Sequence, residues 1–103
     1  MESIYKILWS EEALKNLKLI IGYLENNWTQ KELTHFAQLL DKRLALIEHN
    51  PYAFPLIDDY SNLRRSVLTK QTSIYYQIIG KNVRLITLFD NRQNPEHLTN
   101  KLV

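Results

Sequence analysis

The sequence contains no cysteine, only two glycines, and no apolar run near the ~20 residues that a membrane-spanning helix needs. Without cysteine, a disulfide framework, a thiolate nucleophile and a Cys-ligated zinc site are excluded. With Gly22 and Gly80 alone, no glycine-rich loop can cradle a phosphate. Residues 1–10 lack the basic start and the long apolar stretch of a signal peptide. We therefore expect a cytoplasmic protein that does not bind a membrane.

What is present is the composition of an ordinary globular protein. The chain has 103 residues, of which 45% are hydrophobic and 23% charged, and this predicts a single domain over residues 1–103. The net charge of +2 hides an uneven distribution. Residues 1–60 hold six basic and nine acidic residues, a net −3, whereas residues 61–103 hold seven basic and two acidic, a net +5. The asymmetry predicts a polyanion or an acidic protein as the partner of the second half.

The first half of the chain predicts one strand followed by two helices. Residues 3–9 are rich in β-branched and aromatic types and favour a strand. Ser10 is a candidate N-cap, and apolar residues at three- and four-residue spacing then predict a helix of about four turns. Thr29 and Glu32 have the spacing of a capping box that opens a second helix, which should end at Asn50 because Pro51 follows.

The second half predicts a β-meander. After an irregular connection over residues 51–61, the hydrophobic period changes from 3.6 to 2, and strands are expected at residues 62–68, 73–79 and 83–89. The short connections between them suit hairpin turns. The sequence thus predicts an α+β fold in which the N-terminal strand and a three-stranded antiparallel meander form one sheet. An antiparallel helical hairpin should cover one face and leave the other free for a partner.

Few residues offer catalytic chemistry. No serine lies in a Gly-x-Ser-x-Gly elbow, and the histidines, His35, His49 and His97, do not have the spacing of metal ligands. We expect no metal site and no cofactor. A catalytic or substrate role is considered for His97 alone, because it lies five residues after Arg92.

Arginines gather on the predicted sheet and just beyond its last strand, at Arg64, Arg65, Arg84 and Arg92. Arg64 and Arg65 are neighbours along one strand and should project to opposite faces. Beside Tyr75 on the next strand, guanidinium groups can bind phosphates bidentately and stack on bases. The alternative is a solvated face whose arginines form structural ion pairs, for instance with Asp90 or Asp58. The residues alone leave both interpretations open.

Five segments together carry a family resemblance: YKILWSEEAL (5–14), IEHNP (47–51), LRR (63–65), YYQI (75–78) and FDNRQNP (89–95). In this order and spacing, over nearly the whole chain, they resemble the RelE/ParE superfamily of bacterial toxins. The resemblance implies the toxin of a type II toxin-antitoxin pair, with a helical hairpin on a mostly antiparallel sheet. RelE-like members are ribosome-dependent endoribonucleases that cut mRNA, whereas ParE-like members poison DNA gyrase.

For a ribonuclease, the resemblance implies that the catalytic residues are Arg64, Arg92 and His97. However, Ser66 and Ser73 stand at positions that are basic in RelE-like enzymes, and Leu98 stands where those enzymes have a tyrosine. RNA cleavage needs proton transfer and stabilisation of the developing phosphorane charge. The departures therefore favour a ParE-like toxin that inhibits gyrase. A ribosome-dependent ribonuclease and a degenerate toxin that only binds antitoxin are the alternatives.

The resemblance also implies partners. A cognate antitoxin should hold the toxin inactive with an amphipathic helix or an added strand, acidic where it meets basic side chains. The residues expected to bind the antitoxin or the target are Arg64, Arg65, Arg84, Arg92 and Tyr75. The target is DNA gyrase in the ParE-like case, and the ribosome with its mRNA in the RelE-like case.

Overall fold

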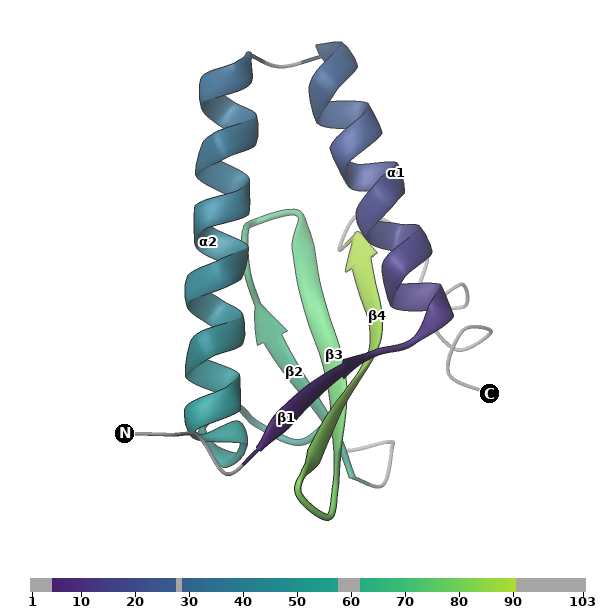
Figure 1. Ribbon diagram of the computed structural model, residues 1–103, viewed down its shortest axis with the longest axis vertical. Helices are drawn as coiled ribbons and strands as arrows, with labels where there is room; N and C mark the ends of the chain where they lie inside the picture. Colours follow the sequence, from purple (N-terminus) through teal and green to yellow (C-terminus); the bar gives the residue numbers. More distant parts are fainter. Residues whose placement is uncertain (1–4, 28, 58–61, 91–103) are drawn as a thin grey trace.

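The computed structural model describes residues 5–27, 29–57 and 62–90. Its elements, in chain order, are β1 (Lys6–Trp9), α1 (Glu11–Asn27), α2 (Gln30–His49), a 3-10 helix η1 (Pro51–Ala53), β2 (Leu63–Val67), β3 (Thr72–Ile79) and β4 (Asn82–Asp90). Figure 1 shows the two helices as a hairpin on one side of the sheet. The predicted α+β fold and its element order are confirmed. None of the helices in the described ranges is long and apolar enough to span a membrane.

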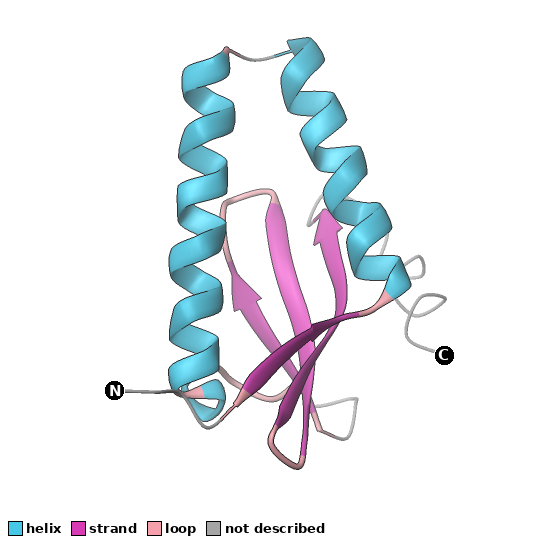
Figure 2. Ribbon diagram, in the orientation of Figure 1, coloured by secondary structure: helices cyan, strands magenta, loops and turns pink. Residues whose placement is uncertain are grey.

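The four strands form one sheet in the order β1-β4-β3-β2 (Figure 2). β2, β3 and β4 are the predicted antiparallel meander. β1 runs parallel to β4, with Lys6 opposite Asn82 and Trp9 opposite Leu85. β1, from the start of the chain, therefore forms one edge of the sheet, beside β4, the last strand in the sequence.

Both helices begin at the predicted caps. Ser10 Oγ accepts a hydrogen bond from the Ala13 amide at 3.0 Å, satisfying one of the donors that a helix N-terminus leaves without a partner. Thr29 Oγ1 accepts from the Glu32 amide at 3.3 Å and donates to Glu32 Oε1 at 3.5 Å. α2 ends at His49, as expected from the proline two residues later.

A single apolar core joins the hairpin to one face of the sheet. Its buried residues come from both helices, from β3 and β4 and from the residue after β2: Ala13, Phe36, Leu40, Ile47, Leu68, Ile74, Tyr76, Ile78, Val83, Leu85 and Leu88. Removal of these side chains from water is the main force that holds the two layers together.

The opposite face of the sheet carries a second, smaller apolar cluster. Leu63, Tyr75 and Phe89 are only 2–4% exposed there, and Ile57 and Ile86 pack against them. The expectation that this whole face is free is therefore wrong for this patch. At these positions the strands carry apolar side chains on both faces. The expectation assumed strands whose residues alternate between one apolar and one polar face.

Candidate functional site

The register of β2 separates the two adjacent arginines. Arg64 pairs with Tyr76 on β3, and Arg65 pairs with Tyr75. Side chains of residues paired across an antiparallel ladder project to the same face. Tyr76 belongs to the core under the helices and Tyr75 to the second cluster. The predicted projection of Arg64 and Arg65 to opposite faces is therefore confirmed.

Arg64 is bound to the segment that follows α2. Its Nη1 donates to the Phe54 carbonyl oxygen at 2.6 Å and to the Tyr52 carbonyl oxygen at 3.4 Å. The guanidinium carbon lies 5.0 Å from the centre of the Tyr52 ring, within the range of a cation-π contact. The buried Arg64 Nε has no hydrogen-bond partner within the described part of the chain. Arg64 thus joins β2 to η1 and is not brought together with Arg65 or Arg84.

Arg65 lies on the far face, with an exposed side chain. Its Nε donates to Ser73 Oγ at 3.4 Å. Burial raises the pKa of the neighbouring Tyr75 phenol above its ordinary value of 10.0, while the positive charge of Arg65 acts in the opposite direction. The structure therefore brings the two predicted binding residues Arg65 and Tyr75 together.

Arg84 lies on the same far face as Arg65, nearer to β1. It pairs with Gln77 on β3 and with Leu8 on β1. Its side chain is exposed and makes no hydrogen bond or ion pair with the residues that the structure describes. Lys6, two positions before Leu8, is exposed on that face as well. We call Lys6 and Arg84 the basic strip.

Ser66 and Ser73, which stand at positions that are basic in RelE-like enzymes, are completely buried. Each accepts a hydrogen bond from an arginine. Arg43 Nη1 donates to Ser66 Oγ at 2.7 Å and also to the Val67 carbonyl oxygen at 2.7 Å. Arg65 is the donor to Ser73. The guanidinium of Arg43 also lies 5.3 Å from the centre of the Phe54 ring. Arginines from other positions therefore supply the cations beside both serines.

Sequence reasoning missed Arg43. Its spacing is the signal that could have found it, because Arg43 lies three residues after Leu40 and four before Ile47, both buried on α2. A charged residue on the buried face of a helix needs a partner, and Ser66 and Val67 on the edge strand provide it.

No side chain that titrates near neutral pH lies among the far-face residues that the structure describes. On the helix-covered face, Tyr76 donates from its hydroxyl to the Pro51 carbonyl oxygen at 2.6 Å, and burial raises the pKa of Tyr76 to about 12 against the opposing charge of Arg64. His35 and His49 are exposed on α2.

The ranges that the structure describes contain no cluster of His, Cys, Asp or Glu suited to a metal ion. Four residues discussed above lie outside them, namely Arg92, His97, Leu98 and Asp58, as does the side chain of Asp90.

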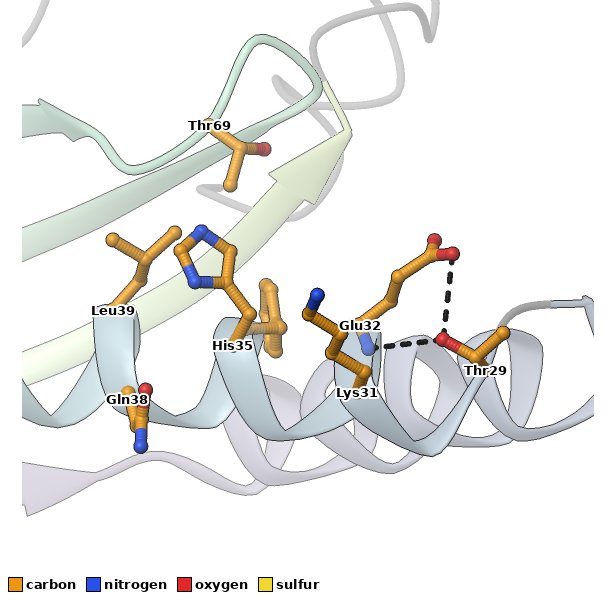
Figure 3. Close-up of a pocket in the computed structure, with 8 residues that line it drawn as sticks. Thr29, Lys31, Glu32, His35, Gln38, Leu39 and Thr69 are labelled. Atoms are coloured by element: carbon orange, nitrogen blue, oxygen red, sulfur yellow. Dashed lines mark hydrogen bonds between the residues drawn. The ribbon is translucent and has the colours of Figure 1, made fainter.

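A pocket of 540 Å³ lies elsewhere, between α2 and the turn after β2. Figure 3 shows His35 and Leu39 on α2 directed toward Thr69 in that turn. The lining residues include none of the predicted site residues. The candidate site is therefore the far face, where Arg65 and the basic strip are exposed around the buried Tyr75.

Several solved toxin structures share this fold. A chain of the chromosomal ParDE toxin-antitoxin system from P. aeruginosa superposes with a TM-score of 0.71 at 11% identity, covering 84% of this chain and 96% of that one. The YoeB/ParE toxin from Agrobacterium tumefaciens gives 0.60 at 12% identity, over 84% and 98% of the two chains. The E. coli DinJ-YafQ complex gives 0.59 at 15% identity, over 84% and 92%.

The sequence comparisons identify the family. A search of curated proteins finds no match. The family model described as the ParE toxin of the type II toxin-antitoxin system parDE, in contrast, matches residues 7–95. That match covers all the described strands and both helices apart from Lys6 in β1. The chain therefore belongs to the ParE toxin family of type II toxin-antitoxin systems, within the RelE/ParE superfamily.

Proposed function

We propose that this toxin arrests growth by inhibiting DNA gyrase, and that a cognate antitoxin neutralises it. The observation that carries the proposal is the burial of Ser66 and Ser73 at positions that are basic in the ribonucleases of the superfamily. Serine carries no charge, so neither position presents a cation to a substrate. Both hydroxyls are also engaged within the chain, because each accepts a hydrogen bond from an arginine.

The chemistry of the far face supports the same choice. Cleavage of RNA by its own 2′-hydroxyl needs a group that can move a proton near neutral pH. The described far face offers the cations of Arg65 and Arg84, but its Tyr75 phenol is buried and its pKa is raised. Arginine side chains such as these keep their positive charge and do not exchange protons with a substrate. Beside a small apolar cluster, they suit binding to another macromolecule better than proton transfer.

An acidic antitoxin is the partner that this surface favours. The second half of the chain carries a net +5, and Arg65 and Arg84 expose their side chains on one face. Two of the similar structures are named as assemblies, the ParDE system of P. aeruginosa and the DinJ-YafQ complex of E. coli. Gyrase and the antitoxin would both meet this toxin in the cytoplasm.

A supercoiling assay tests the proposed target. Purified toxin should stabilise a cleavage complex between gyrase and DNA, and the Arg65→Glu/Arg84→Glu variant should lose most of this effect because both changes reverse exposed charges. The matched control is Lys18→Glu/Lys42→Glu, which reverses two exposed charges on the helices and should behave as the wild type. Ordinary supercoiling at a large excess of toxin would contradict the proposal.

The alternative is a ribosome-dependent ribonuclease that uses Arg64, Arg92 and His97. The contact of Arg65 with Ser73 beside Tyr75 is the feature that keeps it under consideration, because it places an exposed cation on the far face of the central strands. Primer extension on translated mRNA after induction should find no new 5′ ends if gyrase is the target. New ends that vanish in Arg92→Ala/His97→Ala would identify the ribonuclease instead. A chain that fails to arrest growth without antitoxin would be a degenerate toxin.

A further inference from the structure

The pocket between α2 and the turn after β2 has the size and the mixed lining of a small-molecule site. Its volume is 540 Å³, within the range of about 300–1,000 Å³ that such sites occupy. Apolar side chains of α2, Phe36 and Leu39, form part of the lining, and polar residues complete it: Thr29, Lys31, Glu32, His35, Gln38 and Thr69. None of these residues is used by the proposed function, so the pocket is a separate site.

Both walls of the pocket are held in place by the fold. Phe36 is only 6% exposed and belongs to the core, as does Leu40 one turn later, so this part of α2 is fixed against the sheet. In the turn, the Thr69 amide donates to the Thr72 carbonyl oxygen at 3.1 Å. Thr69 Oγ1 accepts from the Gln71 amide at 3.1 Å and from the Thr72 amide at 3.0 Å. A pre-formed site loses little free energy to ordering when a ligand binds.

Charged and titratable side chains surround the apolar part of the lining. Lys31, Glu32 and His35 extend from the side of α2 that faces the turn (Figure 3). The Lys31 ammonium and the His35 imidazole make no hydrogen bond or ion pair with the described residues. Glu32 accepts from the Thr29 hydroxyl through Oε1 at 3.5 Å, which leaves Oε2 without a donor from the described chain. Lys31 and Glu32 do not pair with each other, because successive residues of a helix do not face one another.

This combination of groups defines the ligand that fits. A cation and a carboxylate on one wall suit a molecule that itself carries an ammonium and a carboxylate, the first directed to Glu32 and the second to Lys31 and His35. The apolar surface of Phe36 and Leu39 suits an apolar or aromatic side chain on the same molecule. A simple anion would be repelled by Glu32 and a simple cation by Lys31, so both are poorer ligands.

We propose that this pocket binds a free α-amino acid with an apolar or aromatic side chain, as the zwitterion. The bound molecule would contact both α2 and the Thr69 turn and would stabilise the folded toxin by mass action. This site lies outside the surface assigned to the toxin's partners, and the inference does not depend on gyrase as the target.

An NMR titration of the whole chain with phenylalanine tests the proposal. The amino acid is added up to the millimolar range, and the amide signals of His35, Leu39 and Thr69 should shift along one saturating curve. Two matched probes each remove one charge, since N-acetylphenylalanine lacks the ammonium and phenylalanine amide lacks the carboxylate. Each should bind about tenfold more weakly, because each loses a charge-assisted hydrogen bond.

Paired variants locate the binding. Lys31→Ala/His35→Ala should weaken phenylalanine binding about tenfold and remove the preference over phenylalanine amide. Glu32→Gln should remove the preference over N-acetylphenylalanine. The matched control is Lys42→Ala/His49→Ala, which removes the same two residue types from exposed positions of α2 outside the pocket and should bind as the wild type. The NMR spectrum of each variant reports whether it is folded.

Several results would overturn the proposal. One is the absence of saturating shifts at the pocket amides, and another is equal binding of the three probes. Unchanged binding by Lys31→Ala/His35→Ala, or an equal loss in the control variant, would have the same meaning. None of these measurements involves gyrase or growth arrest, so a failure of the proposed function would be recognised separately.

Discussion

Arg64 on β2 and Phe54, just after η1, are joined by a 2.6 Å hydrogen bond from the guanidinium to the backbone carbonyl. The bond holds the polypeptide that leaves α2 against the sheet, beneath the Tyr52 ring that stacks on the same guanidinium. Arg64 therefore has a structural task whatever its part in toxicity. Its neighbour Arg65 lies on the other face and does not share that task.

Replacement of Arg64 by methionine should destabilise the fold. Arg64→Met keeps an apolar stem but leaves the Phe54 carbonyl without its donor, and we expect the free energy of unfolding to fall by about 1–3 kcal/mol. Urea denaturation measures the change. Arg65→Met, on the exposed face, should stay within about 0.5 kcal/mol of the wild type. An Arg64→Met protein that is fully stable yet non-toxic would assign Arg64 to the functional surface instead.

Arg43 and Ser66 should be energetically coupled. A double-mutant cycle of Arg43→Met and Ser66→Ala removes each partner of the 2.7 Å hydrogen bond in turn. We expect a coupling energy of about 0.5–2 kcal/mol from urea denaturation, because Ser66 is fully buried and its hydroxyl needs a partner. Additive effects of the two substitutions would show that the Val67 carbonyl and the Phe54 ring alone hold Arg43.

Asn16 should be required for the end of β4. Its Oδ1 accepts from the Thr87 hydroxyl at 2.6 Å and from the Leu88 amide, and its Nδ2 donates to Glu12 Oε2 at 2.7 Å. Asn16→Ala leaves buried donors without an acceptor and should cost about 2–3 kcal/mol. The Leu88 amide should then exchange faster than the other amides of β4. Lys15→Ala, at the exposed neighbouring position, is the control and should change neither quantity.

Tyr76 should make stability fall in strong alkali. Its pKa is about 12 in the folded protein, above the ordinary 10.0, because the buried phenol is disfavoured as a phenolate. The stabilisation is fully present below pH 10 and is lost as the pH rises from 10 to 12, on the order of 2 kcal/mol. Tyr76→Phe should remove this part of the pH dependence, measured by urea denaturation at a series of pH values. An unchanged profile would show that other groups cause it.

Local sequence signals predicted the helices and strands well, because their causes are local. Ser10 and Thr29 cap the helices that they precede, since a hydroxyl there can accept from an amide only three residues away. The change of hydrophobic period likewise marked the meander, whose strands lie within one residue of the predicted bounds. The parallel pairing of β1 with β4 was not predicted, because no nearby residue specifies it.

The candidate site was less predictable, because it depends on contacts between distant parts of the chain. The alternation along β2 predicted that Arg64 and Arg65 face opposite ways, but it does not say which of them meets η1. Nor does it reveal that Arg43, on a helix, reaches Ser66 on the sheet edge. The assignment of Arg92 and His97 to the site stays a prediction, since both lie outside the described residues.

The pairing of the first strand with the last also constrains the order of events while the protein is being made. The contact between Ser10 and Ile86 spans 76 positions of the chain. During translation β1 and α1 are synthesised early, yet their neighbour β4 follows only after both helices and two other strands. Contacts this distant must overcome a large loop-closure entropy. The nascent toxin thus cannot close its sheet until β4 has left the ribosome, so an incomplete chain lacks the finished far face.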